Sequence, residues 1–526
     1  MKKLLTIAMV VSAIVLAPVP GEASAVPLAP PGKAPLKSSA LRSISGATPL
    51  PFSSEVGSEP WRYCGTGANE RHWEADNSLA VNPANPDNLA AAWIQDWSDA
   101  IVVAYSYDGG ETWAESVPPT TPCTGGIQKF GNAPGTVSTI DPSVSFGADG
   151  TLYLSTVITS GMFAPSALIV DRSLDGGKTW VPWDDDTNII FQPSHIVDGG
   201  PIPEGVDYSY VVADPQRAGV AYVTWYGVNL ATATTTQYLS VTTDGGENWS
   251  DPSIVPAVGS SFGARLLVRD DGAVVSIGGE HPPQPGVLPG QLLTGASVLT
   301  GPTTVVAKTL VNPTDPGAVW SPPVTIGIAD AQRFVAPTAT LAPDGNSVYV
   351  TWPTTNATKT GFSMMLAASG DGGASWRAPA PVGPPIAGLP ATGNNDVPMA
   401  PSIAVTQDGM IGIAFYDHRA DVPANDPPKR TDVWLRYSKD GGVTWQEEHV
   451  AGPFDKTTAP LGVLADMNGM VVTRKGFAAI FSLAQPLDGA NYSLETQSTT
   501  LEDGSVVSVT NTDIFFTTMR AHGTKR

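Results

Sequence analysis

Residues 106–113 read SYDGGETW, and four close variants of this octapeptide follow along the chain. The variants are SLDGGKTW from Ser173, TTDGGENW from Thr242, SGDGGASW from Ser369 and SKDGGVTW from Ser438. Their tryptophans are separated by 67, 69, 127 and 69 residues, so one interval is nearly double the others. The missing copy should lie near residue 315, where residues 315–320 read DPGAVW and keep the spacing of Asp, Gly and Trp. A fixed period of this size predicts a repeat architecture.

Every period has the same internal order of short β-rich runs. In the second period these runs are DPSVSFGADGTLYLSTVI, ALIVDRS and VPW, with the octapeptide before the last one. Alternating β-branched and aromatic residues, with turns rich in Gly, Asp and Asn, predict four antiparallel strands. Four such strands per unit, repeated around a ring, are the architecture of an all-β β-propeller.

The C-terminal part of the chain predicts a further blade. The runs NGMVVTRKGFAAIFSLA and TDIFFTTMR supply three strands, and the second run echoes TDVWLRYS of the sixth unit. No octapeptide accompanies them. We expect the missing outer strand to come from residues 50–75, so that both termini close the ring. Seven blades are therefore favoured, with six as the alternative.

The octapeptide resembles the Asp-box, or BNR repeat, of sialidases and related propeller proteins, in five good copies and one degenerate copy. We expect it where the third strand of a blade turns into the fourth, with the Asp carboxylate accepting backbone N–H groups. Gly supplies the positive φ of the turn, and Trp packs between sheets. A functional site should then lie on the opposite face of the ring. The aspartates expected to be structural are Asp108, Asp175, Asp244, Asp315, Asp371 and Asp440.

The N-terminal residues predict export. Lys2 and Lys3 precede an apolar run over residues 4–16, and small residues lead to a cleavage site near Ala25. This is the order of a secretory signal peptide, and the apolar run is short for a membrane span. Residues 26–50 are rich in Pro, Ala and Ser and are expected to be flexible, which leaves 51–526 as one propeller domain. Outside the cell, Cys64 and Cys123 are expected to form a disulfide, with two free thiols as the alternative.

The net charge of −21 disfavours nucleic acid and anionic membranes as partners. We expect a secreted monomer without stable membrane insertion, whose partner is a glycan or glycoconjugate. The run Asp184-Asp185-Asp186 is interpreted as a solvated turn rather than a structural calcium site, because calcium needs more oxygen ligands than this run offers. No cofactor and no metal in the functional site are expected, and a structural calcium ion is the alternative for this run.

Long polar loops on the predicted site face hold the candidate functional residues. Sialidases bind the sugar carboxylate with three arginines and use a Tyr–Glu nucleophilic pair and an Asp as acid/base. A planar guanidinium suits a carboxylate because two parallel N–H bonds form together. From their predicted placement on the site-face loops, Tyr416 is assigned as the nucleophile, and Asp417 or Glu74 as the acid/base. The substrate-binding candidates are Arg71, Arg265, Arg333, Arg419 and Glu280.

Each candidate also has a structural interpretation. Arg419 has acidic neighbours at Asp417 and Asp421 and can brace its own loop, and Arg333 can pair with Asp330 in the same way. A solvated loop or a packing role is the alternative for the remaining candidates, which are Arg71, His72, Glu74 and His418.

Three functions are compatible with these residues. The first is an exported glycoside hydrolase that removes an anionic sugar in the manner of an exo-sialidase. The second is a non-catalytic glycan- or protein-binding propeller at the cell surface, which is favoured by the absence of the Phe/Tyr-Arg-Ile-Pro stretch typical of sialidases. The third is a polysaccharide lyase that uses His418 and Tyr416 for proton transfer. The first two rank almost equally.

Overall fold

The structure is a computed structural model of the chain. The ranges that it describes are 35–46, 73–96, 99–121, 124–126, 137–160, 166–182, 188–191, 204–229, 234–281, 302–330, 336–355, 361–387, 399–421, 429–459, 464–465, 468–494, 497–500, 506–509 and 512–521.

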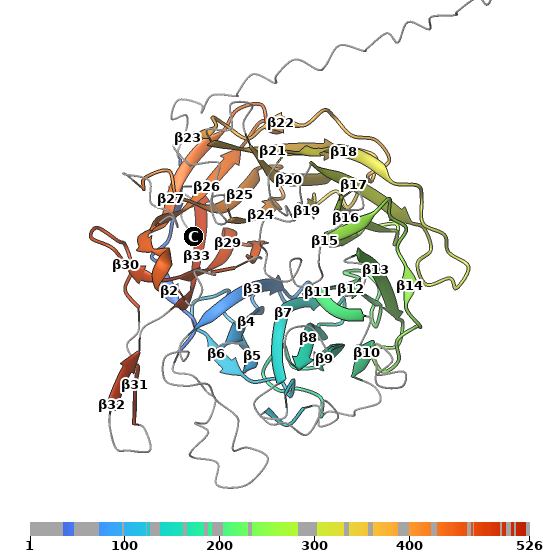
Figure 1. Cartoon of the computed structure of the whole chain (residues 1–526), viewed down its shortest axis with the longest axis horizontal. Helices are drawn as coiled ribbons and strands as arrows, with labels where there is room; N and C mark the ends of the chain where they lie inside the picture. Colours follow the sequence, from blue (N-terminus) through green and yellow to red (C-terminus); the bar gives the residue numbers. More distant parts are fainter. Residues whose placement is uncertain are drawn as a thin grey trace, which may run out of the picture.

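Seven small antiparallel sheets stand in a ring, which confirms the seven-bladed β-propeller (Figure 1). In blades 1 to 4 the strands follow one another in chain order from the inside of the ring outward. Blade 1 contains β3 (Glu74–Val81), β4 (Leu89–Gln95), β5 (Ala100–Ser106) and β6 (Ala114–Ser116). Blade 2 contains β7 (Val137–Phe146), β8 (Leu152–Ser160), β9 (Ser166–Ser173) and β10 (Ile189–Phe191). Blade 3 contains β11 (Glu204–Ala213), β12 (Ala221–Asn229), β13 (Thr234–Thr242) and β14 (Ser253–Ile254). Blade 4 contains β15 (Ser260–Val268), β16 (Val274–His281), β17 (Thr303–Leu310) and β18 (Val324–Ala329).

The last three blades keep this plan with additions at their outer edges. Blade 5 contains β19 (Thr338–Leu341), β20 (Val348–Thr355), β21 (Gly361–Ser369), β22 (Ala380–Pro381) and β23 (Ile386–Ala387). Blade 6 contains β24 (Met399–Val405), β25 (Ile411–Asp417), β26 (Arg430–Ser438), β27 (Gln446–Asp455) and β30 (Gln485–Pro486). Blade 7 contains β28 (Met470–Thr473), β29 (Gly476–Leu483), β33 (Asp513–Ala521), β1 (Leu36–Ser38) and β2 (Arg42–Ser43). A 3₁₀ turn (Lys456–Thr458) and a separate hairpin of β31 (Gln497–Thr500) and β32 (Val506–Val509) complete the described elements.

The hydrophobic core lies between neighbouring blades rather than within any one of them. Strands β4, β16 and β25 are buried at every position, because sheets cover both of their faces. They accordingly read as continuous small or apolar runs instead of alternating ones. One cluster joins Val103 of blade 1 to Leu154 of blade 2, and another joins Met364 of blade 5 to Ile413 of blade 6. Burial of these inter-blade faces holds the ring together.

Each octapeptide forms the turn between the third and fourth strands of its blade. The Asp371 carboxylate accepts hydrogen bonds from the Ser375 N–H at 2.8 Å, the Ser375 hydroxyl at 2.5 Å and the Ser369 hydroxyl at 2.7 Å. Gly372 and Gly373 have φ values of 68° and 91°, which favour glycine. The same pattern recurs at Asp108, Asp175, Asp244 and Asp440. In the degenerate copy, the Asp315 carboxylate accepts the Gly317 N–H at 2.8 Å.

The corner tryptophans pack between blades. Trp445 is fully buried in the cluster between blades 5 and 6, and Trp376 packs against the cluster between blades 4 and 5. The remaining four also lie between their own blade and the preceding one, and they are Trp113, Trp180, Trp249 and Trp320. Each corner thus joins a turn to an inter-blade contact.

The ring is closed by pairing the two ends of the chain in blade 7. Strands β1 and β2 pair antiparallel with β33, so that Leu36 is opposite Ala521 and Arg42 is opposite Phe516. Leu36 is fully buried in the cluster between blades 6 and 7, and its N–H donates to the Tyr437 hydroxyl at 3.0 Å. The outer strand therefore comes from residues 36–43 and not from 50–75. These residues belong to the segment 26–50, which was expected to be flexible. Together with β33 they form the seam that closes the ring.

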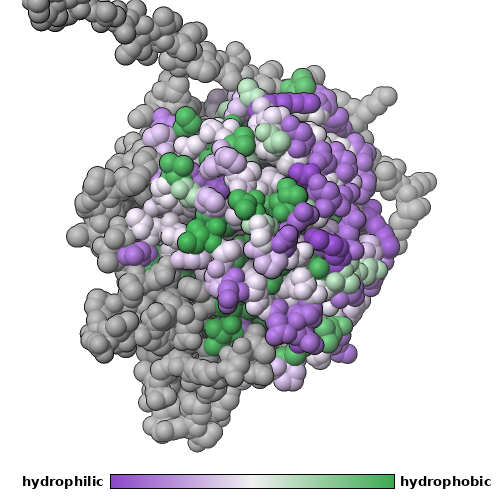
Figure 2. Space-filling model, turned by 90° about the vertical axis from the view of Figure 1, so that its right-hand side faces the viewer, coloured by the Kyte–Doolittle hydropathy of each residue, from purple (hydrophilic) through white to green (hydrophobic). Residues whose placement is uncertain are grey.

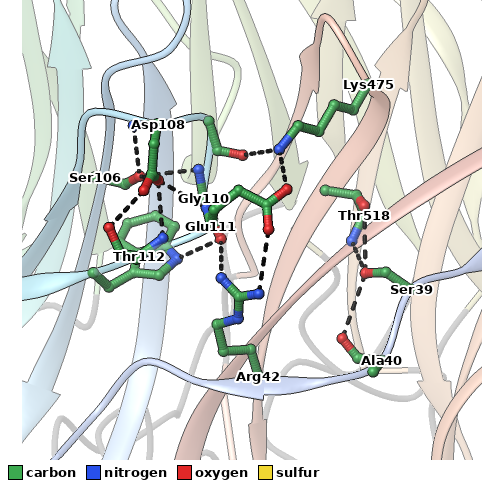
Figure 3. Close-up of polar contacts among 12 residues, drawn as sticks. Ser39, Ala40, Arg42, Ser106, Asp108, Gly110, Glu111, Thr112, Lys475 and Thr518 are labelled. Atoms are coloured by element: carbon green, nitrogen blue, oxygen red, sulfur yellow. Dashed lines mark hydrogen bonds and ion pairs between the residues drawn. The ribbon is translucent and has the colours of Figure 1, made fainter. Parts of the chain in front are cut away.

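Charged residues link the seam to the octapeptide turn of blade 1 (Figure 3). Arg42 donates to the Gly110 carbonyl at 2.8 Å and approaches Glu111 at 3.4 Å. Lys475, from the turn between β28 and β29, binds the other side of Glu111 at 2.5 Å. Glu111 is half-exposed, so this pairing adds little to stability, but it connects the N-terminal strand, blade 1 and blade 7.

Inner strands surround the centre of the ring (Figure 1). Five of them carry a β-bulge. The register shifts within β3, β7, β11, β15 and β24. Each inner strand runs toward the turn that shares a face with the corners, as the bond from Gly245 N–H to the Gly219 carbonyl shows. The bulges therefore lie toward the opposite face. The residues with positive φ in these five bulges are Asp76, Asp141, Tyr208, Gly263 and Ala400.

Exposed aliphatic side chains are scattered over the ring. Figure 2 shows one edge of the molecule, where apolar residues are separated by polar ones. Val319 and Val258 are 81% and 73% exposed, and single exposed residues of this kind are usual on soluble domains. In the described ranges, no helix has the length and apolarity needed to cross a bilayer.

The corner carboxylates predict acid sensitivity. Hydrogen bonds from Ser375 and Ser369 lower the pKa of Asp371 from 3.8 to about 2. The stabilisation that these hydrogen bonds give to the folded state is therefore complete above about pH 4. It is lost as the pH falls toward 2, because the carboxylate then takes up a proton. We expect the free energy of unfolding, measured by urea titration, to decrease over this range, and Asp371→Asn to reduce the decrease. Asp251→Asn, at an exposed aspartate outside the corners, is the control and should leave the slope unchanged.

Substitutions at two adjacent residues of the seam, Leu36 and Lys37, should lower the free energy of unfolding by different amounts. Leu36→Ala should lower the free energy of unfolding by about 2–5 kcal/mol, because it leaves a cavity between blades 6 and 7. Lys37→Ala should change it by less than about 0.5 kcal/mol, since the Lys37 side chain is 58% exposed. Denaturant titration measures both changes. Equal effects would mean that the N-terminal strand does not close the ring in solution.

Candidate functional site

The described residues hold six of the predicted site residues. They are Glu74, Arg265, Glu280, Tyr416, Asp417 and Arg419. The other predicted features lie outside the described residues, and they are residues 1–25, Cys64, Arg71, His72, Cys123, Asp184, Asp185, Asp186 and Arg333. Among the described residues, no group of three or more His, Cys, Asp and Glu side chains is arranged to hold a metal ion.

Tyr416 lies at the end of β25, in the interface between blades 6 and 7. Its side chain is fully buried, and its hydroxyl accepts the Ser482 N–H and donates to the Ser482 carbonyl, both at 3.0 Å. Burial raises the pKa of Tyr416, and the nearby Asp76 carboxylate raises it further. A tyrosine nucleophile needs an accessible hydroxyl whose proton is easily removed. This environment instead stabilises the neutral phenol as a link between two blades.

Asp417 and Arg419 belong to a buried network of charges within blade 6. The Arg419 Nε donates to Asp417 at 2.6 Å, and its NH1 donates to Glu447 at 2.6 Å. Arg436 binds the other Glu447 oxygen at 2.7 Å, and its NH1 donates to the Pro384 carbonyl of blade 5 at 2.9 Å. Burial raises the pKa of Asp417 although Arg419 opposes it.

The Arg419 guanidinium is already engaged by groups of the protein in this arrangement. Two carboxylates occupy it, and its plane lies over the Trp434 ring, 4.4 Å from the ring centre. These contacts match the structural interpretation of Arg419, in which its side chain braces its own loop. The second acidic partner, however, is Glu447 and not Asp421. Its role in substrate binding stays a prediction.

Glu74 begins the inner strand of blade 1 and is fully buried. The Gln95 amide donates to Glu74 at 3.0 Å and to Asp96 at 2.9 Å, while the Trp93 indole donates to the Gln95 carbonyl oxygen at 2.9 Å. Two carboxylates thus share one amide group near the site face. The backbone N–H of Glu74 donates to Thr512 at 2.7 Å, which fixes this strand against blade 7.

Glu280 and His418 are held by their own blades. Glu280 pairs with Lys308 at 2.7 Å, and the two side chains are only 6% and 3% exposed. Burial lowers the pKa of Lys308 even though Glu280 opposes this shift. His418 is 1% exposed, and its Nδ1 lies 2.9 Å from the Thr431 hydroxyl. Neither residue faces solvent in a way that would let it transfer a proton to a ligand.

Arg265 differs from the other candidates because it remains partly exposed. Its guanidinium lies over the Tyr210 ring, 4.9 Å from the ring centre. Within the described part of the chain it forms no hydrogen bond and no ion pair. The neighbouring Glu280 is already paired with Lys308. Arg265 is therefore a cation at the inner rim of the ring without a matching carboxylate.

Two further aromatic residues, which sequence reasoning missed, lie beside Arg265. Tyr208 and Phe262 make an edge-to-face contact with ring centres 4.7 Å apart, and both are partly exposed. The signal was present in the repeat, because Tyr208 occupies a bulge position where other blades carry Asp76, Asp141, Gly263 and Ala400. Only the register of the inner strands shows that these positions are equivalent.

Comparisons with known proteins give likenesses of fold. No protein-family model and no curated protein matches the sequence. A Hadza microbial sialidase has 13% identity and a TM-score of 0.42, over 83% of this chain and 75% of that chain. An intramolecular trans-sialidase from Ruminococcus gnavus has 14% identity and a TM-score of 0.40, over 88% and 96%. An ulvan lyase of a new polysaccharide lyase family has 11% identity and a TM-score of 0.47, over 78% and 92%. The seven-bladed assignment itself rests on the strand pairing.

The charge network of blade 6 predicts a large stability effect. Arg419→Gln should lower the free energy of unfolding by about 3–5 kcal/mol, because the buried Asp417 would lose its ion-pair partner and Glu447 would keep only Arg436. Lys475→Gln is the control, since its partner Glu111 is 51% exposed and the pair should contribute less than about 1 kcal/mol. Chemical denaturation measures both. A stable Arg419→Gln variant that loses ligand binding would instead favour the substrate-binding role.

Proposed function

We propose that this chain is a glycan-binding propeller that recognises an acidic sugar on the face opposite the Asp-box corners. One contrast carries the proposal. The candidate nucleophile Tyr416 and the candidate acid Asp417 are buried and bonded within the fold, whereas Arg265 remains partly exposed and without an anionic partner among the described residues.

Electrostatics supports an acidic ligand. The chain carries a net charge of −21, so a cation that lacks a carboxylate partner stands out against its surroundings. A guanidinium binds carboxylate or sulfate groups through parallel N–H bonds. The proposal also includes secretion after cleavage near Ala25, and a disulfide between Cys64 and Cys123.

A glycoside hydrolase of the exo-sialidase type is the second candidate. One observation favours it, namely that Asp76 of blade 1 lies close enough to Tyr416 of blade 6 to raise its pKa. A tyrosine of blade 6 and a carboxylate of blade 1 are thus near enough to interact electrostatically. Hydrolysis would require the Tyr416 hydroxyl to leave Ser482 and reach a substrate, with Glu74 or Asp417 as acid/base.

A glycan array with product analysis separates the two functions. The array should contain sialylated, uronate-containing, sulfated and neutral glycans, and the eluted glycans should be analysed by mass spectrometry. We expect retention of acidic glycans without any cleaved product. Retention of neutral glycans alone, or no retention, would contradict the proposal, and cleavage of a sialoside would select the hydrolase.

Tyr416→Phe tests the same choice within the protein. It removes a buried hydroxyl that bonds to the Ser482 backbone, so we expect the free energy of unfolding to fall by about 1–3 kcal/mol. Glycan retention should be unchanged. The matched control is Tyr107→Phe, because the Tyr107 ring is 48% exposed and lies on the corner face. A Tyr416→Phe variant that keeps wild-type stability but loses a sialoside hydrolysis shown by the wild type would support the catalytic function.

A further inference from the structure

We propose that Tyr208, Phe262 and Arg265 form a subsite for one acidic pyranose residue at the inner rim between blades 3 and 4. The sugar ring would stack on the aromatic side chains, and its carboxylate or sulfate would bind the guanidinium. This inference rests on the proposed glycan-binding function and specifies where and how the ligand is held.

The β-bulge in β15 places Phe262 and Arg265 on the same side of blade 4. Phe262 is opposite Gly279 and Arg265 is opposite Ile277, so their partners are two residues apart on β16. Residues three apart in a regular strand point to opposite faces, and the extra residue of a bulge reverses this. Gly263, with φ of 63°, lies within the bulge. An aromatic ring and a cation therefore share one face.

The aromatic residues form a stack that continues from the core to the rim. Tyr226 is 1% exposed, and its hydroxyl accepts the Ala264 N–H at 2.9 Å. Phe262 stacks on Tyr226, with ring centres 5.6 Å apart and an angle of 18°. Tyr208 of blade 3 then contacts Phe262 edge to face. The buried tyrosine fixes the position of the two partly exposed rings, which suits a preformed ligand site.

Tyr208 is held in a backbone conformation that is unusual for a bulky residue. Its φ is 52°, in the left-handed region, which costs roughly 1–2 kcal/mol for a residue with a side chain. The Asp141 carboxylate accepts the Tyr208 N–H at 2.8 Å and so holds the bulge in place. Small or polar residues occupy the equivalent positions of other blades, where Asp76 and Ala400 stand. The aromatic residue at this bulge packs on Phe262 and remains partly exposed, so it can also contact a ligand.

Arg265 provides the charge at this position. The Tyr210 ring supports its guanidinium through a cation–π contact, which orients the group but does not neutralise it. Glu280 is paired with Lys308, so it leaves the charge of Arg265 uncompensated. A pyranose ring offers apolar C–H groups to an aromatic face, and an acidic substituent offers two acceptors to the guanidinium. Both features of an acidic sugar are matched by adjacent side chains.

Isothermal titration of the full chain tests the subsite. The probes are tri-galacturonic acid, its methyl ester and a sulfated galactose disaccharide, which together distinguish a carboxylate, an uncharged sugar and a sulfate. Arg265→Gln should weaken binding of the preferred acidic probe by about tenfold or more, and it should remove the preference for that probe over the methyl ester. Tyr208→Asn, which resembles the polar residues of other blades, should weaken binding of both galacturonate probes by about fivefold.

The control is Arg269→Gln, near the corner-face end of the same strand, where Arg269 is paired with Asp271. It should leave binding unchanged, and thermal unfolding should show that all three variants are folded. Acidic-probe binding that is equal in wild type, Arg265→Gln and Tyr208→Asn would overturn the subsite. Failure of wild type to bind either acidic probe would overturn it as well. In both cases the glycan array decides separately whether the glycan-binding function stands.

Discussion

The carboxylate that caps the third-to-fourth turn in blades 1 to 6 is the constraint on which the ring depends. At Asp371 this carboxylate accepts two bonds from Ser375 and one from Ser369, and the turn then places Trp376 against the cluster that its blade shares with the preceding blade. A local hydrogen-bonding pattern thereby sets a contact between two sheets. Because the pattern repeats at a nearly constant spacing, the same relation between neighbouring sheets is repeated until the ring closes.

This arrangement explains why the blades can differ on the face opposite the corners. The corner face is occupied by turns whose polar groups bind one another, as Gly245 and Gly219 do. On the other face the inner strands begin with bulges, and a bulge redirects side chains without disturbing the rest of the sheet. Blades can therefore differ at these positions while their corners stay alike. Tyr208 and Phe262 illustrate the difference, since other blades place smaller residues there.

The sequence predicted the propeller because the spacing of tryptophans is a local and repeated signal. It did not locate the closing strand, since β1 and β2 contain only three and two residues and their extended state is imposed by β33. The contacts of the candidate site residues were harder to predict from the sequence for a related reason, because they also depend on how the strands pair. Asp417 and Arg419 are close in sequence, but Glu447, which completes their network, comes from the fourth strand. Side-chain direction at Phe262 and Arg265 depends on a register shift that no residue pattern displays.

The closure of blade 7 joins residues that are 479 positions apart, as in the bond from Thr518 to Ser39. Such contacts form late in folding, since the loop they close is almost the whole chain. Until then β33 presents an unpaired edge, and another molecule's N-terminal strand offers the same hydrogen bonds as its own. We therefore expect strand exchange between copies to be the main misassembly of this chain, and to become more frequent as protein concentration rises.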